Sequence, residues 1–290
     1  MWSPWRFPRK VTFEHAQVNA HCLGKAGLPI DRRLRLLSFN VQVGIQTASY
    51  HHYLTRSWQH FLPASKRLQN LQRIGLLLSE YDLVALQEVD GGSLRSGQVN
   101  QVEYLANLGS FPYWYQQLNR NLRPFAQHSN GLLSRLEPNE IEDHPLPGPA
   151  GRGAIILRFG DEKDGLIVVM MHLALGTKTR NKQLFYIREH VKDYQHIILM
   201  GDMNTSAREL LQHSPLSTLP LLAPQAKATF PSWRPQKCLD HILISPSLIL
   251  ERFGVLDLPI SDHLPVAMEV RLPEALSISS PPVVIGNLYG

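Results

Sequence analysis

The 290-residue sequence contains only two cysteines, Cys22 and Cys238. That number excludes a disulfide framework, and their spacing is not that of a zinc or redox site. Long apolar runs are also missing, since stretches such as 166–171 are far shorter than the roughly 20 residues that a membrane-spanning helix needs. The basic, aromatic N-terminus is not followed by an apolar region or a small-residue cleavage site. We therefore expect a cytoplasmic protein without a transmembrane segment.

Charged residues are few, at 18% of the chain, while 43% of residues are hydrophobic. This composition is that of a globular protein and excludes collagen-like, coiled-coil and disordered classes. The formal net charge is +5, and the basic residues comprise 20 Arg and 9 Lys. Arginine offers forked donors that suit phosphate oxygens, so the balance slightly favours an anionic partner. We expect the protein to be a monomer.

Short apolar runs rich in Val, Ile and Leu recur along the chain at strand length. They lie at 34–39, 83–86, 131–133, 154–159, 166–171, 196–200, 239–244 and 264–270. Two segments instead place apolar residues at helical spacing, Leu68/Leu71/Ile74/Leu78 and Leu184/Ile187/Val191/Tyr194. The pattern predicts a mixed α/β protein with a two-sheet core and helices outside. We expect an irregular arm at 1–33, one folded domain at 34–272 and a loosely held tail at 273–290.

Polar side chains mark the ends of these runs. Four runs are followed by such residues and two are preceded by them: Asn40, Glu88, His172, Asp202 with Asn204, Asp240, and Asp262 with His263. If the last two strands run antiparallel to the first four, all of these groups converge on one edge of the sheets. The edge would then hold several carboxylates in one pocket with two imidazoles.

Carboxylates gathered in a low dielectric repel one another and stay ionised only when a counter-charge is supplied. A hard dication supplies it. Oxygen ligands without a thiolate suit Mg²⁺ or Mn²⁺, which also coordinate phosphate oxygens, whereas zinc would prefer more His or Cys. The sequence therefore predicts a magnesium or manganese site.

Each of these residues alone is typical of a turn or a strand end, but their joint order is informative. The chain resembles the endonuclease/exonuclease/phosphatase superfamily in six segments: SFNV at 38–41, ALQEV at 85–89, MHL at 171–173, MGDMN at 200–204, LDHI at 239–242 and SDHLPV at 261–266. That superfamily includes DNase I-like nucleases, exonuclease III-like apurinic endonucleases, sphingomyelinases, deadenylases and inositol polyphosphate 5-phosphatases. The resemblance runs from about residue 34 to residue 270.

The resemblance implies a DNase I-like fold, a four-layered α/β sandwich of two mixed β-sheets packed face to face with helices outside. It also implies Mg²⁺-dependent hydrolysis of a phosphoester at the edge of the sheets. By position, Glu88 would be the principal metal ligand, with Asn40 beside it and Asp262 contributing directly or through water.

The remaining residues of the six segments would act on the substrate. By the same resemblance, Asp202 and Asn204 would position or deprotonate the attacking water and hold the phosphate. His263 would contact the phosphate, with Asp240 or a neighbouring carboxylate orienting it. His172 would touch the phosphate or the leaving oxygen. Asp202 is a candidate general base on chemical grounds as well.

Three segments are candidate substrate walls: 46–63, 91–100 with Arg95, and 113–125, which leads to Asn130. Aromatic residues interleaved with arginine could stack on bases while contacting phosphates, or they could pack beneath long loops. The segment 229–235 differs from that of apurinic endonucleases, and we expect its Trp233 to bind substrate together with Arg95 and Asn130.

The substrate stays open at this point. Gln42 stands where apurinic endonucleases commonly carry an acidic residue, which disfavours an abasic-site enzyme. The basic charge slightly favours nucleic acid, cut as an endonuclease or an exonuclease. The alternative is a phospholipid or inositol-phosphate phosphoesterase. A catalytically dead binding module is a second alternative, but every expected ligand position is retained.

Overall fold

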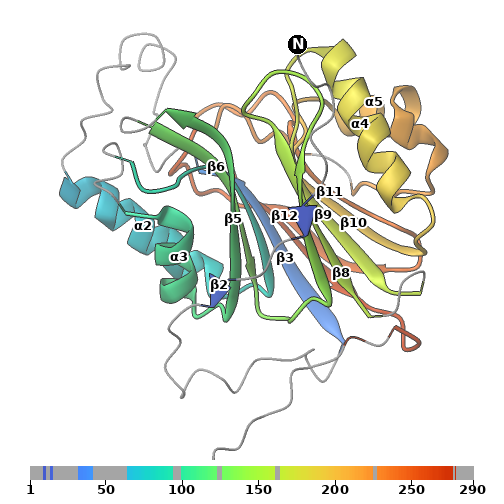
Figure 1. Cartoon of the computed structure of the whole chain (residues 1–290), viewed down its shortest axis with the longest axis horizontal. Coiled ribbons are helices and arrows are strands. Elements are labelled where there is room, and N and C mark those ends of the chain that lie inside the picture. Colours follow the sequence, from blue (N-terminus) through green and yellow to red (C-terminus); the bar gives the residue numbers. More distant parts are fainter. Residues whose placement is uncertain are drawn as a thin grey trace, which may run out of the picture.

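A computed structural model of the chain describes residues 9–10, 14–15, 32–41, 64–93, 99–122, 126–160, 164–224, 227–276 and 278. Two mixed β-sheets pack face to face, with α2 (Ala64–Leu78) and α3 (Gln101–Gly109) on one outer side and α4 (Thr177–Val191) and α5 (Ala207–His213) on the other (Figure 1). A short 3-10 helix, η5 (Pro215–Thr218), follows α5. The predicted four-layered α/β sandwich is confirmed.

The larger sheet has seven strands in the order β12-β13-β3-β4-β6-β5-β2. They are β2 (Glu14–His15), β3 (Arg33–Asn40), β4 (Leu83–Asp90), β5 (Tyr113–Leu122), β6 (Ala126–Ser134), β12 (Ile249–Val255) and β13 (Val266–Arg271). Only β3 and β4 pair in parallel, and the other pairs are antiparallel.

The second sheet has six strands in the order β1-β7-β8-β9-β10-β11. They are β1 (Arg9–Lys10), β7 (Glu140–Pro145), β8 (Gly153–Phe159), β9 (Leu166–His172), β10 (His196–Asp202) and β11 (Asp240–Ile244). β9 and β10 pair in parallel. Gly201 has a φ of 143°, and a Cβ there would lie 1.9 Å from the carbonyl oxygen of Met171. Only glycine therefore allows β10 to approach β9 this closely just before its polar end.

Three hydrophobic clusters hold the layers together. The central one joins the facing sides of both sheets, as with Leu36 and Met268 from one and Val168 and Ile198 from the other. A second packs α4, α5 and η5 on the six-stranded sheet, and a third packs α2 and α3 on the seven-stranded sheet. Successive residues of a strand face opposite sides of the sheet. Alternate side chains of each core strand therefore belong to the central cluster and to the cluster beneath the helices.

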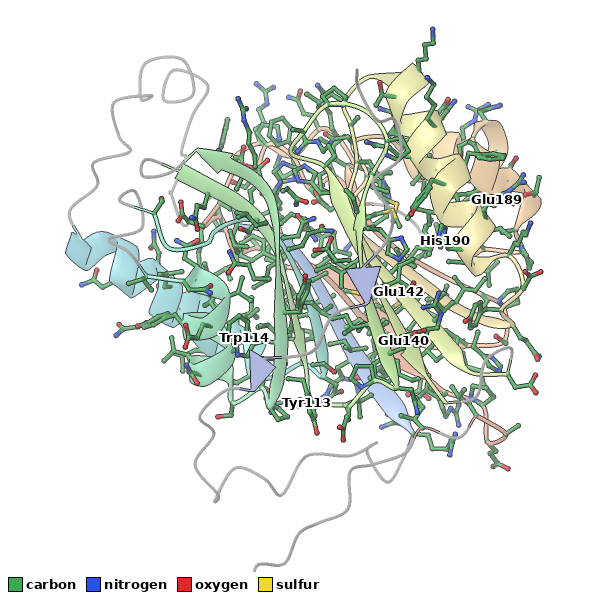
Figure 2. The ribbon with its side chains drawn as sticks, in the orientation of Figure 1. Tyr113, Trp114, Glu140, Glu142, Glu189 and His190 are labelled. Atoms are coloured by element: carbon green, nitrogen blue, oxygen red, sulfur yellow. The ribbon has the colours of Figure 1, made fainter. Side chains whose placement is uncertain are left out.

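The eight predicted strands and both predicted helices are present, and most are longer than predicted. β11 and β13 begin later than predicted, and α4 begins earlier and ends at Val191. β5, β7, β12, α3 and α5 were not predicted. Trp114 of β5 is 3% exposed and packs in the cluster beneath α2 and α3, so this tryptophan belongs to the core and not to a substrate wall (Figure 2). In the described part of the chain no helix is long and apolar enough to cross a membrane.

The predicted arm at 1–33 contains two short strands. Arg9–Lys10 pairs with β7 and Glu14–His15 pairs with β5, so this stretch extends one edge of each sheet. The proposed domain boundaries near residues 33 and 272 stay a prediction.

Candidate active site

The polar strand ends meet at one edge of the two sheets. β3 and β4 run parallel, so Asn40 pairs with the residue that precedes Glu88. β9 and β10 also run parallel, which pairs His172 with Asp202. β11 runs antiparallel to β10, with Asp240 opposite Asp202, and β13 runs antiparallel to β3. The predicted strand directions are therefore confirmed, and they gather the carboxylates and imidazoles at this edge.

Asp202 is a buried carboxylate in the middle of this group. Its Oδ2 accepts a hydrogen bond from Nδ2 of Asn40 at 3.2 Å, and its Oδ1 accepts one from the backbone N–H of Asn204 at 3.0 Å. Nε2 of His172 lies 3.4 Å from Oδ2. Burial, together with the charge of Asp240, raises the pKa of Asp202 to about 7. A carboxylate with this pKa is suited to accept a proton near neutral pH.

Asp240 and His263 form a buried pair. Oδ2 of Asp240 lies 2.8 Å from Nδ1 of His263 and accepts a hydrogen bond from Oγ1 of Thr229 at 2.5 Å. Burial opposes the charged imidazolium, but the charges of Asp240, Asp202 and Asp262 outweigh this effect and raise the pKa of His263 to about 10. His263 is therefore a charged donor whose ring is held by Asp240.

Glu88 is placed by a β-bulge. The register of β4 against β6 shifts between Leu86 and Val89, and Glu88 has a φ of 57°. A left-handed conformation is uncommon for a residue with a side chain, and a bulge redirects the side chain that it carries. The side chain of Glu88 is 34% exposed, whereas Asp202, the central carboxylate, is 2% exposed as a residue. Glu88 is thus the carboxylate that faces solvent.

Asp262 is tied to the end of β3 through Ser261. The Ser261 hydroxyl donates to the carbonyl oxygen of Asn40 at 2.6 Å and lies 3.2 Å from Oδ1 of Asp262. The backbone N–H of Ser232 donates to the carbonyl oxygen of Asp262 at 2.8 Å. Burial raises the pKa of Asp262 to about 6, and the charge of Glu88 adds to this shift.

The donor set fits a hard divalent cation. Ligand atoms of Asp202, Asp240 and His263 lie within 4.8 Å of one another, and Oδ1 of Asp240 is buried without a hydrogen-bond partner among the described residues. Burial is the main cause of the raised pKa values of Asp202 and Asp262, and the neighbouring carboxylates Glu88 and Asp240 add to it. The residues assigned to the metal by the sequence are all oxygen donors beside this cluster: Asn40, Glu88 and Asp262. Their role as ligands stays a prediction.

A cleft of about 470 Å³ lies beside the cluster, and its lining includes Glu88 and His172, whose Nε2 lies 3.4 Å from Oδ2 of Asp202. Its other lining residues are Asn119, Arg120, His128, Ser129, Asn130, Pro149, Ala150, Gly151, Arg152, Ala174, Leu175, Gly176 and Thr179. His172 is buried, and Nη1 of Arg152 lies 3.2 Å from its Nδ1. Burial, with Arg152 adding to it, lowers the pKa of His172 well below its usual value, so this imidazole is neutral.

The other predicted site residues lie in different settings. The side-chain amide of Asn204 donates to the carbonyl oxygen of Leu173 at 2.9 Å, so it braces the end of β9, while its backbone contacts Asp202. Asn130 lines the cleft, and its Nδ2 donates to Oε1 of Gln117 at 3.0 Å. Oδ1 of Asn130 is buried without a partner among the described residues.

Trp233 lies away from this cleft, and Arg95 lies outside the described residues. Trp233 is half-buried in the turn that carries Ser232, and it does not line the cleft. Arg95 falls in residues 94–98, outside the described part of the chain. Their roles in substrate binding stay predictions.

Arg152 was missed by sequence reasoning, although the same signal marks it. It directly precedes β8, and β8 runs antiparallel to β9 with Gly153 opposite His172. When two neighbouring strands are antiparallel, a polar residue just before one strand lies at the same edge of the sheet as a polar residue at the end of the other. Asp240 follows this rule, and so does Arg152, although arginine is not a metal ligand.

The comparisons with known proteins agree with this geometry. The sequence model of the Endonuclease/Exonuclease/phosphatase family matches residues 37–263. The chain belongs to this family. Members of the family hydrolyse phosphoester bonds. Comparison of the sequence with curated proteins found no match.

Solved structures with the same fold include several members of the family. The endonuclease/exonuclease/phosphatase from Beutenbergia cavernae DSM 12333 is 19% identical, with a TM-score of 0.63 over 84% of this chain and 72% of that chain. The mannosyl-6-phosphatase Bt3783 of Bacteroides thetaiotaomicron VPI-5482 is 18% identical, with a TM-score of 0.59 over 82% and 99%. TDP2 of D. rerio, complexed with single strand DNA product, is 18% identical, with a TM-score of 0.58 over 83% and 99%.

Proposed function

We propose that this protein hydrolyses phosphodiester bonds by attack of water assisted by Mg²⁺ or Mn²⁺, with nucleic acid as the preferred substrate. The observation that carries the proposal is the buried group of Asp202, Asp240 and His263, whose ligand atoms lie within 4.8 Å of one another at the edge where Glu88 faces the cleft. Such a group supplies an acceptor for a proton and a charged donor, and the neighbouring Asn40, Glu88 and Asp262 would give a place for a dication.

In this proposal some side chains bind the metal ion and another accepts a proton. Asn40, Glu88 and Asp262 would hold the metal ion, and the bound ion would supply positive charge that offsets the charge on the phosphoryl oxygens. Asp202, with a pKa of about 7, takes the proton of the attacking water.

The two imidazoles stabilise the charge that develops on the phosphate. His263 donates a hydrogen bond to a phosphoryl oxygen, and its 2.8 Å contact with Asp240 fixes the ring for this task. His172 is neutral and donates from Nε2 to the phosphate or to the leaving oxygen. Asn204 holds Asp202 in place through its backbone N–H.

The preference for nucleic acid is supported by the positive charge along the cleft and by one structural neighbour. Arg120, His128 and Arg152 line the cleft beside Glu88. TDP2 of D. rerio, which has the same fold, is complexed with a single strand DNA product. The alternative is hydrolysis of a smaller phosphoester, such as an inositol phosphate or a phospholipid head group. The fold neighbours that are named as phosphatases, Bt3783 and the 2',3'-cyclic phosphatase ANGEL2, support that alternative.

The test begins with bis-p-nitrophenyl phosphate in the presence of Mg²⁺, Mn²⁺ or EDTA. Hydrolysis that depends on the metal is expected, and full activity after exhaustive EDTA treatment would refute the mechanism. A panel of single-stranded DNA, RNA, plasmid, sphingomyelin and inositol phosphates then identifies the substrate. The highest kcat/KM on sphingomyelin or on an inositol phosphate would overturn the assignment of nucleic acid.

A further inference from the structure

We infer that the cleft beside the reaction centre binds a second phosphate group of the substrate through Arg120, His128 and Arg152. This inference rests on the proposed function, because the first phosphate is the one that is hydrolysed. It specifies the substrate class as a phosphoester with at least one further phosphate near the scissile one.

The β5–β6 hairpin supplies the first part of this subsite. Arg120 of β5 is the register partner of His128 of β6, and the register shifts between Leu118 and Arg120, which marks a β-bulge. Directly paired residues present neighbouring side chains on one face of the sheet, and a bulge redirects the side chains next to it. Both residues line the cleft. The hairpin therefore places an arginine beside a histidine on the wall that faces the substrate.

The segment between β7 and β8 supplies the second part. Arg152 lines the cleft, and its Nη1 lies 3.2 Å from Nδ1 of His172 and 3.3 Å from the carbonyl oxygen of Gly151. Both contacts are to neutral acceptors. Among the described residues neither Arg152 nor Arg120 forms an ion pair within 4.0 Å, so both guanidinium charges face the cleft without a protein counter-ion.

The charges of the cleft lining are therefore unbalanced. Among the described residues Glu88 is the only carboxylate that lines this cleft, and in the proposed function its charge would be balanced by the metal ion. Arg120 is exposed and Arg152 is half-buried, so the two side chains give the cleft a positive charge that attracts an anion. A phosphate suits the site because guanidinium groups donate paired hydrogen bonds to its oxygens.

This arrangement discriminates between substrate classes. A head group with a cation next to the scissile phosphate, such as phosphocholine, would meet like charge from the two arginines. A second phosphate would meet opposite charge. It can belong to the next nucleotide of a nucleic-acid strand or to a small molecule that carries several phosphates, and the chemistry recognised is the same.

The decisive experiment compares two substrates that differ only in the second phosphate. Thymidine 5'-(p-nitrophenyl phosphate) is measured with and without a 3'-phosphate, using the full chain loaded with Mg²⁺. We expect kcat/KM to be about tenfold higher or more with the 3'-phosphate, since a charge-assisted hydrogen bond contributes on this scale. Equal values for the two substrates would overturn the inference.

Three arginine-to-glutamine variants show whether Arg120 and Arg152 cause the preference for the 3'-phosphate. Arg120→Gln and Arg152→Gln should each lower the ratio of the two kcat/KM values by several-fold. Arg208→Gln removes the same charge from an exposed position on α5, outside the cleft, and should leave the ratio unchanged. If all three variants lower the ratio equally, the preference comes from overall charge and the subsite does not exist.

A third substrate separates the two sources of the second phosphate. Methylation of the 3'-phosphate gives the monoanion found within a nucleic-acid strand, whereas the free 3'-phosphate mimics a multiply phosphorylated small molecule. Retention of the preference with the methyl ester assigns the subsite to a strand. Its loss, with the free phosphate still preferred, assigns the subsite to a small molecule.

The failure of this inference can be told apart from the failure of the proposed function. If no phosphoester is hydrolysed with either metal, the proposed function fails. Calorimetric binding of thymidine 3',5'-bisphosphate and thymidine 5'-phosphate still tests the subsite in that case. Tighter binding of the bisphosphate that is lost in Arg120→Gln and retained in Arg208→Gln supports the subsite, and equal binding refutes it.

Discussion

Arg152 donates a hydrogen bond from Nη1 to Nδ1 of His172 across 3.2 Å, and this contact fixes the tautomer of the histidine. A guanidinium has donors only, so Nδ1 of His172 must act as the acceptor. The ring proton then resides on Nε2, which lies 3.4 Å from Oδ2 of Asp202 and 3.9 Å from Oε1 of Glu88. His172 therefore presents a donor to the reaction centre, and Arg152 acts as a positioning residue.

The first prediction concerns this tautomer. In protein labelled with ¹⁵N-histidine and loaded with Mg²⁺, His172 should be protonated at Nε2 and unprotonated at Nδ1. Arg152→Met should give a mixture of tautomers and lower kcat more than it raises KM, because the donor is then misplaced in part of the molecules. Arg208→Met is the control and should change neither quantity. A wild-type spectrum with Nδ1 protonated would contradict the assigned role of Arg152.

The second prediction concerns Glu88. Glu88→Gln should weaken metal binding by at least the roughly 10- to 100-fold that loss of an outer-shell partner costs, and activity should fall with it. Titration with Mn²⁺ followed by calorimetry checks the affinity. Without metal the variant should be at least as stable as the wild type, since the charge of Glu88 raises the pKa values of Asp202 and Asp262 by repulsion. A lower melting temperature in EDTA would show that Glu88 stabilises the fold instead.

The third prediction concerns His263 and Asp240. His263→Ala should lower kcat by roughly 10² or more with little change in KM, because charge stabilisation acts mainly in the transition state. Asp240→Asn should have a smaller effect in the same direction, since the 2.8 Å contact remains while the charge that favours the imidazolium is lost. If His263→Ala retains activity within about threefold of wild type, the histidine is structural.

The fourth prediction concerns Glu142 of β7, which lies on the face of the six-stranded sheet that α4 covers, near His190 (Figure 2). Its Oε2 lies 2.9 Å from Nε2 of His144 and 2.8 Å from Nη1 of Arg158. The hydrogen bond with His144 lowers the pKa of Glu142 to about 2. Arg158 also lowers this pKa, whereas burial raises it. Because this pKa is lower in the folded state than in the unfolded state, the ionised Glu142 stabilises the fold above pH 4.5. This contribution is lost as the pH falls toward 2.

Glu142→Gln should therefore reduce the free energy of unfolding at pH 7 by about 1–3 kcal/mol, a figure reduced for solvent screening. The difference from wild type should shrink between about pH 5 and pH 2, as measured by urea unfolding at each pH. Glu189→Gln is the surface control, because Glu189 forms ion pairs with Arg188 and Lys192 at the end of its own helix, and its effect should be small throughout. A difference for Glu142→Gln that does not vary with pH would contradict the assignment.

Much of the fold could be predicted because the core strands carry continuous apolar runs. β9 and β10 are buried at every residue, and their sequences LIVVMMH and HIILMGD are typical of buried β-strands. β5, in contrast, reads YWYQQLNRNL, in which three aromatic residues are followed by a mainly polar stretch, and its Gln117 accepts a hydrogen bond from Asn130 of β6. Its polar residues made it look like a loop, and only pairing with β6 reveals it as a strand.

The sequence by itself determined which chemical groups reach the active edge, because a polar residue at the end of an apolar strand has few other places to go. Only the tertiary structure decided how those groups act. The bulge at Glu88 turns that carboxylate toward solvent, and the burial of Asp202 brings its pKa to about 7. The contact of Arg152 with His172 joins residues 20 positions apart. Bulges, burial and contacts between strands depend on pairing and packing, and no local pattern of residues encodes them.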